Sequence, residues 1–249
     1  DTAHVESLAG PVAEAEAVFA TADKELAAVD SSVFMGRLEK QFNSFRDQVE
    51  KASGALDSAK VATDILPAML GADGPRRYVL VFQNNAEIRG TGGLAGAASY
   101  IEAADGKLTL KAHAAGSSLG EATNPVLPLT KAETALYGEQ LGTYFVNAGM
   151  TPDVPRVADL IRARWEQEFP RQQVDGVRMV DAVAIAYLLD ASGPVTIGGV
   201  TLTGDNVVDE LLHKSYLRLP DPKDQDAFFA AVSAAAFKKF VDGAGESTS

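Results

Sequence analysis

Residues 2–61 alternate between apolar and polar positions with the three- and four-residue spacing of amphipathic helices. The polar stretch Asp30-Ser31-Ser32 interrupts the pattern and offers capping side chains for a second helix. The first stripe comprises Val5, Leu8, Val12, Ala15, Phe19, Ala22 and Leu26, and the second comprises Leu38, Phe42, Phe45, Val49 and Leu56. The pattern predicts an antiparallel helical hairpin. Such a hairpin is either a stalk or partner-binding coil, or simply an element packed on the main domain.

A short third helix is predicted from Asp64 to Leu70, and the glycines and proline of 71–75 mark an expected domain boundary. The β-rich apolar run that follows predicts a buried strand over 77–83. After it come a polar, glycine-containing loop at 83–93 and a β-hairpin over 94–113 with its turn at Asp105-Gly106.

Beyond this hairpin the pattern becomes mixed. Residues 114–130 are irregular, and a loop of that length is usually functional or mobile. Helices are predicted at 131–141, 154–169, 181–189, 206–216 and 224–240, and strands at 144–146, 174–180, 195–197 and 200–202. Strands that alternate with helices predict an α/β (α+β) domain, with flanking helices on a mixed central sheet.

Composition narrows the possible functions. The 249 residues are 46% hydrophobic, which favours a folded chain, and carry a formal net charge of -12, which argues against nucleic-acid binding. The absence of cysteine removes disulfides, thiolate chemistry and most structural zinc sites. No apolar run is long enough to span a bilayer and no signal peptide is visible. The chain opens on Asp1 rather than Met, so we expect a fragment, and the upstream part has room for a membrane anchor.

The polar stretch after the first strand is the strongest candidate for chemistry, because ligands of open α/β sheets bind beyond the carboxyl ends of strands. Its candidate ligand-binding residues are Asn84, Asn85, Glu87, Arg89 and Thr91. The guanidinium of Arg89 suits phosphate or carboxylate, and Glu87 either holds Mg²⁺ or pairs with Arg89. The structural alternative is a polar network that only stabilises the connection between strand and loop.

A second polar cluster contains Asn147, Asp153 and Arg156. Asp153 and the neighbouring Thr151 are explained by capping of the helix that follows, whereas Asn147 at a predicted strand end is not. Neither a phosphate-binding loop nor a nucleophile elbow occurs. His4, His113 and His213 lack the spacing of metal ligands, so no resident cofactor is expected.

Three long segments carry a family resemblance: YVLVFQNNAEIRGTGG, FVNAGMTPDVPRVADLIRARW, and VDGVRMVDAVAIAYLLDASGPVTI followed by LTGDNVVDELL. They resemble the bacterial DUF4012 family, a domain of unknown function, over residues 60 to 240. Members look like single-pass membrane proteins with a large extracytoplasmic domain. The pattern along the chain divides it into a helical hairpin at 1–70, an α/β domain at 71–241 and a disordered tail at 242–249, and the resemblance implies that the hairpin is membrane-proximal. It also implies a location outside the cell membrane, attached through an N-terminal anchor.

A more distant similarity is to the LytR-CpsA-Psr family, which transfers cell-wall glycopolymers from a polyprenyl-pyrophosphate carrier. Glu87 and Arg89 resemble the acidic-x-Arg loop of that family. Its other arginine motifs are only weakly matched or are missing in this sequence. One hypothesis is therefore an envelope protein that binds or scaffolds a glycopolymer, a polyprenyl carrier or an envelope protein. The alternative is a Mg²⁺-assisted glycopolymer phosphotransferase, in which Arg89 and Arg156 hold the pyrophosphate and Glu87 the metal.

Overall fold

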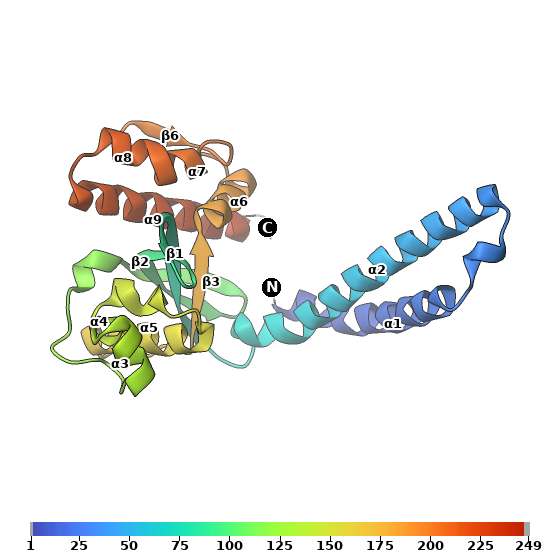
Figure 1. Cartoon of the computed structure of the whole chain (residues 1–249), viewed down its shortest axis with the longest axis horizontal. Helices are drawn as coiled ribbons and strands as arrows, with labels where there is room; N and C mark the ends of the chain where they lie inside the picture. Colours follow the sequence, from blue (N-terminus) through green and yellow to red (C-terminus); the bar gives the residue numbers. More distant parts are fainter. Residues whose placement is uncertain (1, 247–249) are drawn as a thin grey trace. The chain divides into compact units, whose positions relative to one another are not determined.

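The chain divides into two compact units in a computed structural model that describes residues 2–246 (Figure 1). The first unit extends to Pro75 and includes the segment 103–107. The second unit consists of residues 76–102 and the chain from residue 108 onward. The prediction of a mixed α/β fold that follows an N-terminal helical hairpin is confirmed.

The hairpin of the first unit is formed by α1 (Thr2–Ala27) and α2 (Gly36–Met69), joined by a turn that contains the 3₁₀ helix η1 (Ser31–Val33). The Asp30 side chain caps this turn by accepting from the Ser32 amide at 3.0 Å. Across the seam, Lys60 Nζ lies 3.2 Å from Glu16 Oε2. The separate helix predicted at 64–70 is wrong: it is the end of α2, because no glycine or proline falls between residues 55 and 66 to interrupt the helix.

The second unit contains a four-stranded sheet in the order β3-β2-β1-β4. Its strands are β1 (Arg76–Arg89), β2 (Gly92–Ala104), β3 (Lys107–Ala115) and β4 (Gly176–Asp181). β1 and β4 pair in parallel, from Tyr78 opposite Gly176 to Gln83 opposite Asp181. The predicted turn between β2 and β3 is confirmed: Asp105 and Gly106 have φ values of 50° and 78°, which a two-residue hairpin turn of this type requires.

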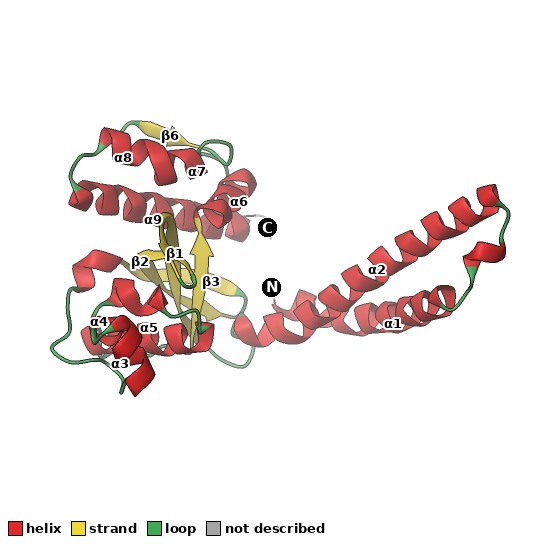
Figure 2. Ribbon diagram, in the orientation of Figure 1, coloured by secondary structure: helices red, strands yellow, loops and turns green. Residues whose placement is uncertain are grey.

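Helices cover both faces of this sheet (Figure 2). On one face Val79 and Val81 of β1 pack with Leu160 and Trp165 of α5 (Val154–Glu168), and these four side chains are fully buried. The same side carries η2 (Gly116–Leu119), α3 (Lys131–Tyr137), α4 (Gln140–Thr143) and η3 (Phe145–Met150). The other side carries α6 (Ala182–Ser192), the small β5 (Val195–Ile197) and β6 (Val200–Leu202) hairpin, α7 (Val207–Asp209), η4 (Glu210–Lys214), α8 (Ser215–Arg218) and α9 (Pro222–Glu246).

Several predicted elements take another form. The strand predicted at 144–146 is wrong, since Tyr144 makes only an isolated bridge to Glu121 before the 3₁₀ helix η3 begins. The helix predicted at 206–216 contains a π-helical segment, η4, between two short α-helical pieces. Helix α9 continues to Glu246, where a disordered tail was predicted from residue 242, and residues 247–249 lie outside the described part of the chain.

Arg164 is a charged residue whose burial has no local signal in the sequence. Its side chain is buried on α5, where Nη2 donates to the Leu119 carbonyl and Nη1 donates to Glu168 at 3.1 Å. Nη1 and Nη2 find acceptors, whereas Nε is buried without a hydrogen-bond partner, and the bond to Leu119 holds the loop at η2 against the core. Within residues 2–246, no helix combines the length and the apolar character needed to cross a membrane.

Candidate functional site

Four of the candidate polar residues after the first apolar run lie in a strand and not in the predicted loop, and Thr91 lies in the turn that follows. β1 continues through Asn84, Asn85 and Glu87 to Arg89, past Gln83, the last of its residues paired with β4. The far half of β1 therefore extends beyond the parallel partner and stays paired only with β2 in the sheet order. The loop prediction was wrong because these polar side chains have partners outside the sheet, which the local sequence does not contain.

Tyr216 on α8 is the main partner, and it joins two of the candidate residues. Its hydroxyl accepts from Asn84 Nδ2 at 2.6 Å and donates to Glu87 Oε1 at 3.1 Å. Burial raises the pKa of the Tyr216 hydroxyl, and the Glu87 carboxylate adds to that rise while the bond from Asn84 opposes it. The phenol therefore keeps the proton that it donates to Glu87.

Two residues three positions apart on a regular strand point to opposite faces, yet Asn84 and Glu87 reach the same hydroxyl. The Asn84 side chain also accepts from the Ala86 amide at 3.1 Å, a local bond that competes with the sheet ladder. We infer that the alternation of β1 is broken between these positions. This irregularity brings the amide and the carboxylate together at Tyr216.

The glycine-rich turn between β1 and β2 packs against the backbone of η3 and the residues that follow it. A Cβ at Gly90 would lie 2.6 Å from the Met150 carbonyl oxygen, so only glycine fits this approach without a shift. The Thr91 amide donates to the Gly149 carbonyl at 3.2 Å. Gln83 Nε2 reaches back to the Thr91 carbonyl at 3.2 Å. The turn thus uses its polar groups and its glycines for close packing within the protein.

Arg89 lies at the end of β1 and is half-buried, and its Nη1 donates to the neighbouring Ile88 carbonyl at 2.9 Å. Glu87 and Arg89 were considered as a possible ion pair. In the described part of the chain no ion pair joins them, because Glu87 is held by Tyr216. Asn85 is half-buried nearby, and its Oδ1 is buried without a hydrogen-bond partner.

The second polar cluster is divided. Asn147 belongs to η3, the element that the β1–β2 turn contacts through Gly149 and Thr91. Asp153 is the N-cap of α5 and accepts from the Arg156 amide at 3.2 Å, as the capping explanation predicted. The structure therefore brings Asn147 toward the end of β1 and assigns Asp153 to the helix end.

Arg156 is directed away from these groups to α3. Its Nε and Nη2 bind the two carboxylate oxygens of Glu133 at 2.7 and 3.2 Å, and Nη2 also donates to the Pro128 carbonyl at 2.7 Å. The hydrogen bond from Arg156 lowers the pKa of Glu133, and a bond from the Thr130 amide adds to it. Thr130 and Glu133 form a reciprocal capping box, so Arg156 serves to anchor α3.

The side chains around Glu87 give little support to a magnesium site. Among residues 2–246 no group of three or more histidine, cysteine, aspartate or glutamate side chains is placed to hold a metal ion. Magnesium is usually held by one or two carboxylates, with the remaining positions filled by water or substrate oxygens. Glu87 supplies one carboxylate, and that carboxylate already accepts a hydrogen bond from Tyr216.

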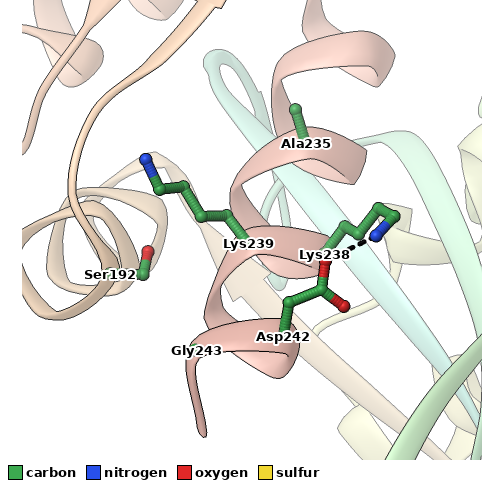
Figure 3. Close-up of a pocket in the computed structure, with 6 residues that line it drawn as sticks. All are labelled: Ser192, Ala235, Lys238, Lys239, Asp242 and Gly243. Carbon is green, nitrogen blue, oxygen red and sulfur yellow. Dashed lines mark hydrogen bonds and ion pairs between the residues drawn. The ribbon is translucent and has the colours of Figure 1, made fainter. Parts of the chain in front are cut away.

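A surface hollow of about 390 Å³ lies elsewhere, between α6 and α9 (Figure 3). It is lined by Ser192, Ala235, Lys238, Lys239, Asp242 and Gly243, none of which was a candidate. Lys238 pairs with Asp242, and Lys239 Nζ donates to the Pro194 carbonyl at 2.6 Å. Because both ammonium groups are engaged, this hollow is a weak candidate for a binding site.

Tyr216 and the buried pair of Ser99 and His113 were not identified from the sequence. Ser99 Oγ lies 2.8 Å from His113 Nδ1 on adjacent strands, and burial lowers the pKa of His113. Ser99 is fully buried, so this pair packs the sheet and offers no accessible nucleophile. The sequence places these two residues on the two strands of a predicted β-hairpin, and it gives no further sign that they pair.

Comparisons with known proteins give one match. Neither the curated proteins nor the solved structures include a significant match to this chain. The family model described as "Protein of unknown function (DUF4012)" matches residues 73–216, which is more than half of the 249-residue chain. The chain therefore belongs to the DUF4012 family.

Proposed function

We propose that this chain is the extracytoplasmic domain of a membrane-anchored bacterial envelope protein that binds or scaffolds a cell-envelope component. The resemblance of the three long segments supports the location. Most of the candidate polar groups are already bound by other residues of the protein, which favours binding over group transfer. Asn84 and Glu87 hold Tyr216, Thr91 holds η3, and Arg156 is paired with Glu133.

Group transfer from a pyrophosphate carrier needs several cations or a metal to hold the developing charge. Of the two arginines assigned to that task, Arg156 is occupied by a carboxylate on α3. Arg89 stays at the end of β1, and the carboxylate of Glu87 on the same strand accepts from a phenol. The Mg²⁺-assisted phosphotransferase is accordingly the second candidate.

Cosedimentation with purified bacterial cell walls that carry their glycopolymer tests the proposal. We expect the full chain to pellet with the walls and Arg89→Ala to pellet less, because Arg89 is a partly exposed cation at this rim. Arg162→Ala is the matched control, since its exposed side chain pairs only locally with Asp159 at 3.0 Å. Absence of wall binding by the wild-type chain contradicts the glycopolymer form of the proposal.

A second assay distinguishes transfer from binding. The chain is incubated with a short-chain polyprenyl-pyrophosphate-linked sugar, Mg²⁺ and the same walls, and release of prenyl phosphate is measured. We expect no release above that of the Arg89→Ala variant. Release that depends on both Arg89 and Mg²⁺ would establish the phosphotransferase instead.

A further inference from the structure

The helical hairpin of the first unit leaves large apolar side chains exposed on both of its helices. Among its described residues only Val49 is a buried hydrophobic side chain. Besides Val18, Val61 and Ile65, five large apolar side chains of α1 and α2 are 37–56% exposed: Leu8, Phe19, Leu38, Phe45 and Leu66. A pair of helices with so little core gains stability when another surface covers such residues.

These five side chains lie on one side of the hairpin. Glu16 and Lys60 meet across the seam and mark the direction in which each helix faces the other. Counting about 100° per residue, Leu8 and Phe19 fall about 60–80° from Glu16, and Phe45 and Leu66 about 60–120° from Lys60, in the same rotational sense. Because α1 and α2 are antiparallel, equal senses of rotation lead to the same side. We call this surface the apolar face.

The apolar face has charged borders of opposite sign. Glu25 borders it on α1 and Lys51 borders it on α2, and both side chains are exposed. We call two residues level when they lie at the same height along the hairpin axis. The contacts Glu16–Lys60 and Ser31–Asn43 show that an α1 residue and an α2 residue are level when their numbers sum to about 75. By that rule Glu25 and Lys51 stand at the same level, at opposite edges of the face.

We propose that a second copy of this chain covers the apolar face, so that two hairpins form an antiparallel four-helix bundle. A two-fold axis parallel to the hairpin places α1 of each copy against α2 of the other and keeps every residue at its level. Glu25 of one copy then meets Lys51 of the other, and symmetry forms this ion pair twice. Phe19 of one copy faces the region of α2 that carries Ala52 and Ala59, where small side chains leave room for a ring.

The size of the face suits a dimer. A surface two helices wide, roughly 20 Å, and as long as the 26 residues of α1, about 39 Å, covers about 800 Å². A standard interface buries about 800 Å² per partner. The hairpin itself therefore offers the area that a stable dimer needs.

Sedimentation velocity and multi-angle light scattering on the full chain test the proposal. We expect a dimer at micromolar concentration, and we expect Phe45→Asp to raise its dissociation constant by about a hundredfold, because an apolar anchor is replaced by a charge. Val61→Asp is the matched control: Val61 is 50% exposed on α2 but lies on the side away from the apolar face. A monomeric wild type, or a Val61→Asp effect as large as that of Phe45→Asp, overturns the proposal.

Charge reversal tests the pairing between copies. In a dimer of Glu25→Lys, each of the two contacts between positions 25 and 51 of different copies pairs two lysines. In a dimer of Lys51→Glu, each of these contacts pairs two glutamates. Each variant alone should therefore dimerise less than the wild type. Mixing the two variants pairs every lysine with a glutamate across the interface, and we expect a heterodimer to form. Circular dichroism confirms that both variants remain helical, and a mixture that stays as weakly associated as its components contradicts the two-fold arrangement.

Discussion

The carboxylate of Glu87 and the hydroxyl of Tyr216 lie 3.1 Å apart, although 129 residues separate them in the sequence. The same hydroxyl accepts from Asn84, which is buried on the same strand. The far half of β1, which has no parallel partner strand beyond Gln83, is thus joined to α8 by side chains. This contact positions the candidate polar residues, so it should be important for stability as well as for binding.

We predict that Tyr216→Phe lowers the free energy of unfolding by about 1–3 kcal/mol, because it leaves the buried Asn84 amide without its acceptor. Urea denaturation followed by circular dichroism measures the change. Tyr187→Phe is the matched control, since Tyr187 is 69% exposed and should change stability by less than about 0.5 kcal/mol. Equal effects of the two substitutions would show that the Tyr216 hydroxyl makes no net contribution.

Gly90→Ala should destabilise the protein by about 1–3 kcal/mol, because the new methyl group would meet the Met150 carbonyl oxygen at 2.6 Å and force the backbone to move. Gly54→Ala supplies the contrast. Gly54 lies inside α2, and a methyl group added there would meet nothing within 4 Å, so alanine should stabilise the helix by about 0.5–1 kcal/mol. Thermal denaturation of both variants checks the opposite signs.

Arg156→Ala should lower stability by about 1–2 kcal/mol at neutral pH, because Glu133 and the Pro128 carbonyl lose a charged donor. The hydrogen bond from Arg156 holds the pKa of Glu133 below its ordinary value of 4.5. A lowered carboxyl pKa gives stability that is present above 4.5 and lost as the pH falls through the folded-state pKa. The difference between wild type and variant should therefore shrink in acid, and Arg162→Ala, with its exposed local pair, should show no such trend.

His113 predicts a second pH dependence, in a different range. Burial lowers the pKa of His113 below its ordinary value of 6.5, so the unfolded chain takes up the proton first as the pH falls. Stability should decline below pH 6.5 by no more than about 1.4 kcal/mol per pH unit from this group. Urea unfolding at about pH 7.5 and about pH 5.5 should show a smaller difference in His113→Gln than in the wild type. His213→Gln, at an exposed position, should retain the wild-type difference.

The sequence predicts the elements whose periodicity and punctuation are local. The hairpin follows from two uninterrupted apolar stripes, the β2–β3 turn from Asp105-Gly106, and the start of α5 from the cap at Asp153. In each case the decisive residues are neighbours in the chain. Chain-local physical chemistry therefore suffices for these parts of the fold.

The polar half of β1 could not be predicted in the same way. Amides and charged side chains are poor strand formers, and the run from Asn84 to Arg89 becomes a strand only because β2, Tyr216 and η3 supply partners. Those partners are distant in sequence. Arg164 shows the same effect, since its acceptor at Leu119, which is distant in the sequence, allows a charged residue to be buried in α5.

For the candidate residues too, the sequence predicts what is local and not what depends on distant partners. Their types and their positions after an apolar run pointed to one end of the sheet, and Asn84, Glu87, Arg89 and Thr91 do lie together there beside η3. The sequence does not show which partner each side chain hydrogen-bonds to in the folded protein. Arg156 illustrates this, because its guanidinium is used by Glu133 on a helix that the local pattern does not connect to it.

The antiparallel packing of α1 and α2 also fixes the distance between the two ends of the hairpin. Thr2 and Met69 stand at one end of the hairpin, and the turn at Ser31–Val33 stands at the other, about 39 Å away along the 26 residues of α1. Val33 and Met35 at that turn are 76% and 86% exposed. Anything tethered before Thr2 is therefore separated from this apolar tip by a fixed helical spacer, and the length of that spacer can be changed in whole heptads without altering the seam.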